Sequence, residues 1–297
     1  QDNGSSFDSQ AEGWRDWIGA DGMEGFVDKS DLDIMYGMIQ FGQMYRTEDG
    51  GQTLIGIGEP GVGSGEWVTP FEQHPVLTNT IYVGYNIVYE SSNKGISWSA
   101  ISQNFGGSLD EMKISPSNPQ VMYASNGGVF YKTIDGGNTD WILMTTPGGL
   151  INSIAIHPTD PDKVAVATSS GNKVLVSTDG GVTWNSYLFN LPNFSALSVV
   201  WDDNGEDGLY LGMNYGIYYI DNSFTEWQPY FNNLPNVIIN ELEINKNDEN
   251  IYAGSYGRGL WASPIVPQIL DVDSFITEDQ VSVSPNPARD LVTIDFQ

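Results

Sequence analysis

Cysteine is absent from this 297-residue chain and basic residues are scarce: 11 lysines and arginines stand against 38 aspartates and glutamates, for a formal net charge of −27. Without cysteine there is no disulfide, thiolate metal site or cysteine nucleophile. So negative a chain repels phosphate backbones and anionic lipid headgroups, which argues against nucleic acid as a partner. No apolar run approaches 18 residues, which argues against membrane insertion. Signal-peptide features are missing after Gln1, so we expect a soluble chain whose export signal was removed or lies outside this sequence.

Helical patterns are also hard to find. The chain contains 34 glycines and 15 prolines, and short stretches rich in tyrosine, valine and isoleucine lie between turn residues along its whole length. Such stretches are typical of β-strands. With 40% hydrophobic residues the chain has enough apolar surface for a large core. The sequence therefore predicts an all-β globular fold.

One turn pattern recurs about every 43 residues. It combines Ser or Thr, an acidic or amide residue, one or two glycines and usually a Trp. The acidic or amide positions are Asp49, Asn93, Asp135, Asp179 and, in a degraded fifth copy, Asp221. The carboxylate or amide accepts hydrogen bonds from turn N–H groups, glycine adopts positive φ, and the Trp can pack its ring beneath the turn. We interpret these residues as structural. A period near 43 with several strand signals per unit is typical of a four-stranded propeller blade.

These turns resemble the Asp box, or BNR repeat, of a group of β-propellers that includes sialidases, the sortilin luminal domain and xyloglucan-cleaving endoglucanases. The resemblance implies an all-β propeller of four-stranded antiparallel blades and says little about function. Six blades are visible, or six to eight if blades precede this sequence. Residues 1–20 are interpreted as the outer part of a further blade or as the piece that closes the sixth. Innermost strands are expected near 24–28, 67–73, 109–115, 151–157, 195–201 and 238–244.

The pattern breaks after the sixth unit. We assign residues 1–263 to the propeller, 264–280 to a linker and 281–297 to the truncated start of another domain. The last segment, with Pro285-Asn286-Pro287, is similar to the opening of the type IX secretion C-terminal sorting domain. Segments such as 256–261 resemble large secreted BNR-repeat proteins of Bacteroidota. These resemblances imply a secreted or outer-surface protein that uses the type IX secretion machinery.

A binding face follows from propeller topology. The loops between the second and third strands of each blade and the connectors between blades emerge on one side. Aromatic rings there stack on sugars and anchor protein partners. We therefore predict a recognition module for a glycan or a protein at the cell surface. Alternatively, these rings only cover the ends of neighbouring blades, or the propeller is a passive scaffold of a larger surface protein. The candidate binding residues are Phe41, Tyr85, Asn126, Tyr215 and Tyr256.

An enzyme is the other alternative. Glycoside hydrolysis needs two carboxylates across a cleft, one with a raised pKa. Weak candidates for such a pair near the axis or rim are Asp21, Glu24, Asp110 and Glu111. A sialidase is disfavoured, because that resemblance implies an arginine triad and a tyrosine nucleophile. The chain has four arginines, of which Arg46 precedes a box and Arg289 lies in the C-terminal segment.

Metal and histidine chemistry are weakly indicated. His74 and His157 are the only histidines and occupy equivalent turns before a proline, so we interpret them as turn residues. Asp202, Asn204 and Glu206 alternate like calcium ligands, but Asp207 stands where a calcium loop has glycine and no bidentate Glu follows at the twelfth position. Apart from this weak calcium site, no cofactor is expected.

Overall fold

The computed structural model describes residues 4–9, 13–61, 65–266, 282–284 and 293–295. The chain divides into two compact units, Gln1–Ile265 and Val266–Gln297. The first unit contains all the blades. In the second, β26 (Ser282–Ser284) pairs antiparallel with β27 (Thr293–Asp295). Most of the predicted linker and of the predicted sorting segment lies outside the described residues.

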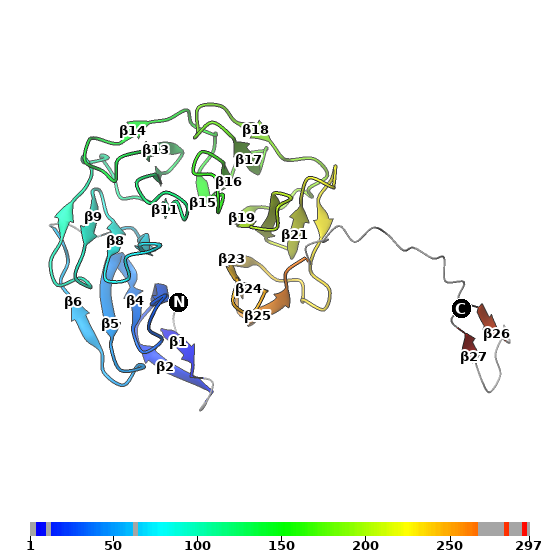
Figure 1. Cartoon of the computed structure of the whole chain (residues 1–297), viewed down its shortest axis with the longest axis horizontal. Coiled ribbons are helices and arrows are strands. Elements are labelled where there is room, and N and C mark those ends of the chain that lie inside the picture. Colours follow the sequence, from blue (N-terminus) through cyan, green and yellow to red (C-terminus); the bar gives the residue numbers. More distant parts are fainter. Residues whose placement is uncertain (1–3, 10–12, 62–64, 267–281, 285–292, 296–297) are drawn as a thin grey trace. The chain divides into compact units, whose positions relative to one another are not determined.

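The first unit is a six-bladed β-propeller (Figure 1). In each blade the strands pair antiparallel in chain order, with the first strand innermost, as the repeat predicts. Among the described residues the first five blades have four strands each. Blade 1 is β3 (Gly22–Val27), β4 (Met35–Ile39), β5 (Gln43–Thr47) and β6 (Ile55–Ile57); blade 2 is β7 (Phe71–Gln73), β8 (Ile81–Gly84), β9 (Val88–Ser91) and β10 (Ser99–Ala100); blade 3 is β11 (Glu111–Ile114), β12 (Met122–Asn126), β13 (Val129–Thr133) and β14 (Ile142–Leu143).

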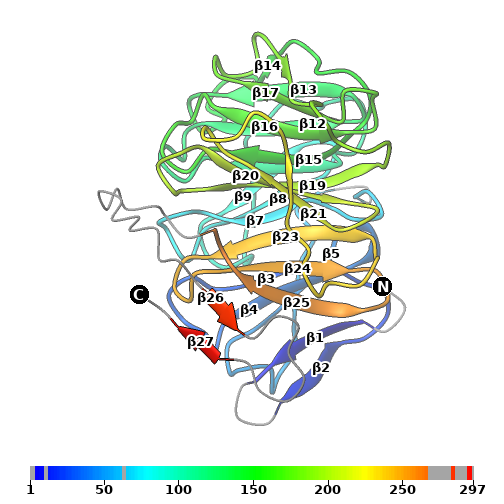
Figure 2. The same cartoon turned by 90° about the vertical axis from the view of Figure 1, so that its right-hand side faces the viewer.

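The ring continues through three further blades, which Figure 2 shows from the side. Every predicted innermost strand is present within the predicted range or one to two residues from it. The bounds of the remaining strands are, for blade 4, β15 (Ile151–Ile156), β16 (Val164–Thr168), β17 (Val174–Ser177) and β18 (Asn185–Ser186); for blade 5, β19 (Ala196–Asp202), β20 (Gly208–Met213), β21 (Ile217–Ile220) and β22 (Gln228–Pro229); for blade 6, β23 (Ile239–Asn245), β24 (Asn250–Ser255) and β25 (Gly259–Pro264).

The N-terminal hairpin does not close the sixth blade. β1 (Ser5–Asp8) and β2 (Trp14–Ile18) pair only with each other in a separate two-stranded sheet, and blade 6 has three strands in the described residues. The hairpin packs on blade 1, where a Cβ added to Gly37 would come within 2.5 Å of Ile18 Cδ1. Among the described residues the hairpin therefore adds no strand to blade 6, and its assignment to a further blade stays a prediction.

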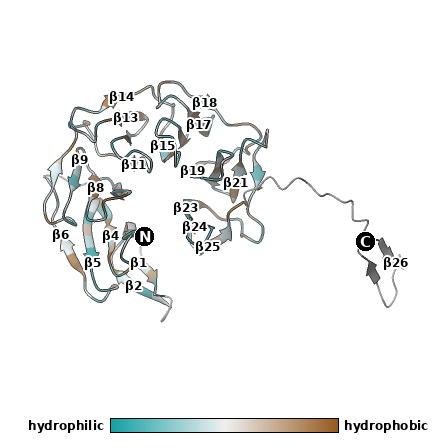
Figure 3. Ribbon diagram, in the orientation of Figure 1, coloured by the Kyte–Doolittle hydropathy of each residue, from teal (hydrophilic) through white to brown (hydrophobic). Residues whose placement is uncertain are grey.

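The core lies between the blades. Tyr36 and Met38 of blade 1 are fully buried against Phe71 and Ile81 of blade 2, and three similar clusters join the later blades. Figure 3 accordingly shows hydrophobic stretches spread around the ring rather than gathered in one part of it. Because a blade cannot bury its own two faces, each blade is stabilised by its neighbours. The only helical segment among the described residues is three residues long, and none could cross a membrane.

The recurring turns form one hydrogen-bonded motif. In the copy at Asp179, Oδ1 accepts the backbone N–H groups of Val182 and Thr183 at 3.1 and 2.9 Å, and the Ser177 hydroxyl accepts the Gly181 N–H. Gly181 has φ +88°, which favours glycine. The hydrogen bonds hold the pKa of Asp179 down at about 2. The same bonds to the fourth residue after the acid or amide recur at Asp49, Asn93 and Asp135.

The degraded fifth copy departs from this pattern. Asp221 accepts the Ser223 N–H and hydroxyl and the Tyr219 hydroxyl.

The sequence suggested that each tryptophan packs beneath its own turn, but in the structure the tryptophans also bond to the neighbouring blade. Each box tryptophan donates its indole N–H to a backbone carbonyl of the preceding blade, at 2.7 to 2.9 Å. The reason is geometric: the turn lies at the outer edge of its blade, where the ring can reach across the junction. The four donor–acceptor pairs are Trp98–Gly58, Trp141–Ile101, Trp184–Thr145 and Trp227–Tyr187. We call these bonds the tryptophan cross-links.

Lysines also join neighbouring blades. Lys132 of blade 3 binds Asp162 of blade 4 at 2.6 Å, and Lys246 of blade 6 binds the buried Asp202 of blade 5 at 2.6 Å. Lys113 binds Glu72 of blade 2, and Lys163 binds Asp207 of blade 5. The scarce basic residues are thus largely committed to the junctions.

Replacing Trp227 by Phe should lower the free energy of unfolding by about 1–2 kcal/mol, because a buried indole loses its bond to Tyr187 and leaves that carbonyl without a donor. Trp261→Phe is the matched control: this indole is 37% exposed and bonds only within its own turn, to Arg258. Urea unfolding of both variants measures the difference. Equal losses would show that the cross-link adds nothing.

Candidate functional site

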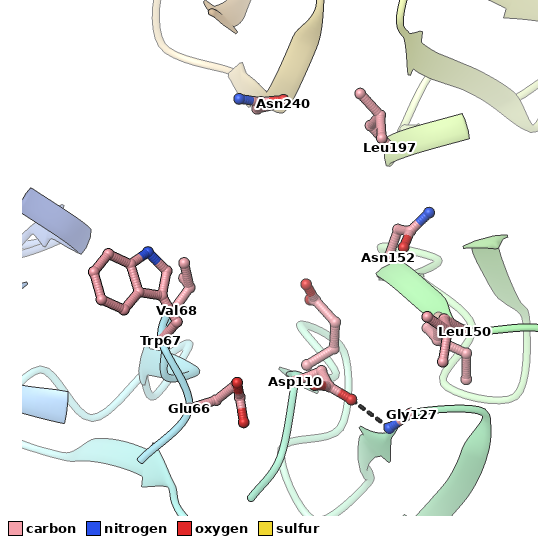
Figure 4. Close-up of a pocket in the computed structure, with 11 residues that line it drawn as sticks. Glu66, Trp67, Val68, Asp110, Gly127, Leu150, Asn152, Leu197 and Asn240 are labelled. Atoms are coloured by element: carbon pink, nitrogen blue, oxygen red, sulfur yellow. Dashed lines mark hydrogen bonds between the residues drawn. The ribbon is translucent and has the colours of Figure 1, made fainter. Parts of the chain in front are cut away.

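A cavity of about 430 Å³ opens on the face that carries the connectors between blades. Five of the six blades contribute to its wall, so its residues come from widely separated parts of the sequence (Figure 4). Residues from strand beginnings, from connectors and from the β12–β13 turn surround the opening. They are Glu66, Trp67, Val68, Asp110, Glu111, Gly127, Leu150, Ile151, Asn152, Leu197 and Asn240. We call this cavity the axial pocket.

Two predicted carboxylates line the axial pocket. Asp110 directly precedes β11, and its carboxylate accepts the backbone N–H of Gly127. Burial raises the pKa of Asp110, and the charge of Glu66 across the pocket adds to the rise. The neighbouring Glu111 is the first residue of β11. Burial raises its pKa well above the usual range, and Glu241 adds to the effect against the opposing charge of Lys113.

The pocket also has an apolar wall. Trp67 is 39% exposed and meets the edge of the Phe41 ring at a centroid distance of 5.2 Å. Leu150, on the blade 4 side, exposes more than half of its surface. No lysine, arginine or histidine is among the lining residues. The pocket therefore offers an aromatic surface, carboxylates and amides, with no cation of its own.

Of the acidic lining of the axis below the pocket, sequence reasoning named Glu24 and missed Glu72, Glu241 and Glu243. Glu24, Glu72, Glu241 and Glu243 come from the innermost strands of blades 1, 2 and 6, and their charges act on one another around Lys113. Glu241 remains open to solvent in the axial space. Crowding by protein and by Glu24 nevertheless raises its pKa to about 8. The repeat could have revealed these acids. Blades 4 and 5 have the apolar residues Ala155 and Val200 at this position of the innermost strand, whereas blades 2 and 6 have the acidic residues Glu72 and Glu243.

The predicted aromatic ring is only partly accessible. Tyr85 is 5% exposed, and its hydroxyl donates to the Gly42 carbonyl at 2.7 Å, so it covers a blade end. The ring of Phe41 contacts Trp67, which lines the pocket. Tyr215, half-exposed, packs on Phe194 at 4.8 Å. The structure thus places these rings apart rather than in one continuous platform.

Two other binding candidates lie outside the pocket lining. Tyr256 is 69% exposed in the loop after β24. Asn126 is half-buried and lies so close to Gly107 that an added Cβ there would meet its amide at 2.7 Å. Of the weak catalytic candidates, Asp110 and Glu111 line the axial pocket, whereas Asp21 and Glu24 do not. Sequence reasoning also did not select Glu66 and Trp67, which lie at and directly after the end of the glycine-rich stretch 54–66, where no catalytic or binding motif is recognisable.

The histidines lie on the opposite face. His74 Nδ1 accepts the backbone N–H groups of Val76 and Leu77 at 3.0 Å, which organises the turn. His157 Nδ1 accepts the Thr159 N–H, and its ring packs edge-on against Trp201. Burial lowers the pKa of both histidines.

Two of the three possible calcium ligands, Asp202 and Asn204, already have protein partners. Asn204 Oδ1 accepts the backbone N–H groups of Glu206 and Gly208 at 2.9 and 3.1 Å. Asp202 is fully buried, with one carboxylate oxygen bound to Lys246. Asp207, at the position where a calcium loop has glycine, binds Lys163 and has φ +56°. Calcium binding at this turn stays a prediction.

No family model matches the chain, and no curated protein matches it. Solved structures do match its fold. The GH74 xyloglucanase from Xanthomonas campestris is 14% identical with a TM-score of 0.68, over 88% of this chain and 49% of that chain. A GH74 enzyme from Niastella koreensis is 18% identical with a TM-score of 0.60, over 82% and 36%. YCF48 bound to D1 peptide is 16% identical with a TM-score of 0.62, over 82% and 77%.

These similarities show the fold alone. The chain spans half or less of each of these two GH74 enzymes and about three quarters of YCF48. The neighbours therefore include glycoside hydrolases and a propeller bound to a peptide.

The axial carboxylates should make stability fall as the pH rises from about 4.5 to about 8. A folded-state pKa raised above the ordinary value of 4.5 means that the protonated form stabilises the fold. For Glu241 this contribution is complete below about pH 4.5 and is lost as the pH rises through about 8. Chemical unfolding of Glu241→Gln between pH 5 and 9 should show a smaller loss than wild type, whereas Glu226→Gln, an exposed carboxylate, should follow wild type. Parallel curves for all three proteins would contradict this.

Proposed function

We propose that this protein is a recognition module that binds a glycan in the axial pocket. The observation that carries the proposal is the joint presence of Trp67, carboxylates and amides around one cavity. A sugar ring has an apolar face that stacks on indole and hydroxyls that donate to carboxylates and amides. The absence of a cation among the lining residues disfavours an anionic sugar such as a sialic acid.

A protein partner is the other form of the same proposal. The fold neighbour YCF48 bound to D1 peptide supports a peptide as ligand, and the GH74 neighbours support a polysaccharide. We favour the glycan because the lining of one pocket combines the partly exposed Trp67 ring with carboxylates and amides that can bind hydroxyls. Tyr215 and Tyr256 extend this face and would contact the outer units of a longer ligand.

We also propose that the protein acts outside the cell. The resemblance of residues 281–297 to a type IX sorting domain supports export by that route, and the resemblance of segments such as 256–261 to large secreted BNR-repeat proteins of Bacteroidota supports an extracellular propeller. Fusing residues 266–297 to a fluorescent protein in a bacterium with type IX secretion tests whether this short segment is a sufficient export signal. Export should place fluorescence on the cell surface or in the medium. Fluorescence retained inside the cell would show that the segment is not sufficient.

Replacing Trp67 by Ala should weaken glycan binding at least tenfold, because its partly exposed ring is the aromatic surface of the pocket on which a sugar can stack. A glycan array first identifies the ligand, and calorimetry then measures the dissociation constants. Phe224→Ala, which removes an exposed ring from a turn outside the pocket, is the matched control and should bind like wild type. Binding that is unchanged in Trp67→Ala, or a ligand found only among peptides, would overturn the glycan proposal.

A glycoside hydrolase is the second candidate, and one observation favours it: Glu66, Asp110 and Glu111 share one pocket, with raised pKa values at Asp110 and Glu111. A protonated carboxylic acid beside an ionised carboxylate is the pair that this chemistry requires. The GH74 fold neighbours support the same class of reaction.

If the protein is an enzyme, it should release reducing ends from a β-glucan or xyloglucan panel. Asp110→Asn should then lower kcat by at least a hundredfold with the fold intact, since a general acid or base is lost. Asp21→Asn, outside the pocket, should leave the rate unchanged. Binding without any product, in wild type as in Asp110→Asn, would leave recognition as the function and reject hydrolysis.

A further inference from the structure

The outer edge of blade 6 differs from every other blade edge described. Blades 1 to 5 each end in a fourth strand of two or three residues, whereas β25 has no outer neighbour among the described residues. All six residues of β25 are exposed, including Leu260 at 52% and Trp261 at 37%. An unpaired strand edge offers a row of N–H and C=O groups to another strand.

The tryptophan cross-links show what normally occupies this position. In blades 2 to 5 a Trp stands directly before the fourth strand and donates to the preceding blade. The carbonyl acceptors are Gly58, Ile101, Thr145 and Tyr187, spaced 42 to 44 residues apart. The next position in this series is Tyr230, the residue after β22 of blade 5. No group in the described part of the chain donates to the Tyr230 carbonyl.

A side-chain amide of the preceding blade also binds the backbone of the box tryptophan at two of these junctions. The Asn190 side chain clamps the backbone of Trp227: its amide donates to the Trp227 carbonyl at 3.1 Å and its oxygen accepts the Trp227 N–H at 2.8 Å. Gln103 clamps Trp141 in the same way. The sequence Tyr-Leu-Phe-Asn-Leu-Pro-Asn that contains Asn190 recurs on blade 5 as Tyr-Phe-Asn-Asn-Leu-Pro-Asn, with Asn233 in the position of Asn190.

The blade 5 copy of this clamp is unused in the described structure. Asn233 is exposed, with φ +65°, and its amide has no partner among the residues described. Leu191 is buried at 9% beneath Trp227 and its neighbours, whereas the equivalent Leu234 is partly exposed. The Tyr230 hydroxyl binds the Pro264 carbonyl at the end of β25, so the clamp and the strand edge adjoin.

We propose that this edge, formed by β25, the Tyr230 carbonyl and the Asn233 amide, is a docking site for an extended strand that carries a tryptophan. The indole N–H binds the Tyr230 carbonyl, Asn233 clamps the tryptophan backbone, and the residues after it pair with Trp261 and Ala262. The pairing register follows from blade 5, where Ile217 lies opposite Gly212 as Leu260 lies opposite Gly254. A main-chain ladder supplies affinity, and the indole supplies specificity.

The strand comes from a polypeptide segment other than residues 4–266. Within that range every tryptophan already belongs to a blade, a connector or the N-terminal hairpin, and residues 267–297 contain none. The internal series is the argument for the occupant's chemistry: the four filled junctions all use a tryptophan followed by a short strand.

The chain supplies its own probe. A labelled peptide copying Gly181–Leu188, which contains Trp184 and the fourth strand of blade 4, is titrated with the full chain and followed by fluorescence anisotropy. Saturable binding is expected, at least tenfold weaker for the peptide with alanine in place of tryptophan. Asn233→Ala should weaken binding severalfold, because two hydrogen bonds are lost. The neighbouring exposed Asn236→Ala is the matched control and should bind like wild type.

Three results would overturn the proposal: no binding, equal binding of both peptides, or binding unaffected by Asn233→Ala. A concentration-dependent dimer in light scattering that Asn233→Ala disrupts would also reject it, since a second copy would then occupy the edge. Asn233 is exposed and bonded to nothing described, so the variant should keep the wild-type melting temperature, and a lower value would show a structural role instead. None of these outcomes depends on glycan binding in the axial pocket.

Discussion

Burial of blade faces against neighbouring blades is the constraint on which this structure depends. A four-stranded sheet has two faces, and here both can leave water only through contact with other blades. The clusters around Tyr36 and Phe71 in blades 1 and 2, and around Trp201 and Trp227 in the later blades, meet this need. The tryptophan cross-links add a directional bond to each of these apolar contacts, so each junction has a defined register as well as a buried area.

Charge is distributed in keeping with that constraint. Few basic residues are present, and several lysines lie at junctions, where Lys132 and Lys246 pair with carboxylates of the adjacent blade. The innermost strands therefore retain carboxylates such as Glu241 that lack individual cations. Crowding by the surrounding protein and the charges of neighbouring carboxylates raise the pKa values of Glu111 and Glu241. The same concentration of carboxylates makes the axis acidic.

The two surfaces proposed to bind ligands differ in chemistry and in origin. The axial pocket is formed by side chains from five blades and offers an indole with hydrogen-bonding groups to a small, chemically varied ligand. The edge at β25 is formed mostly by backbone and by the unused clamp at Asn233. Its specificity derives from the repeat itself, since a junction that recurs four times defines what completes the fifth.

The repeat made the fold and the innermost strands predictable from sequence, because turn residues such as Asp179 and Gly181 act through bonds within seven neighbouring residues. Interactions between residues this close in sequence can be predicted from the sequence pattern alone. Asp110 and Glu111 could be assigned to the mouth of the axis for the same reason, as they begin an innermost strand. The partners of Trp184 and Trp227, the burial of Tyr85 and the placement of Trp67 and Asp110 around one pocket depended on tertiary structure. Each of these arrangements brings together residues about 40 positions apart, and its geometry is set by how one blade twists against the next.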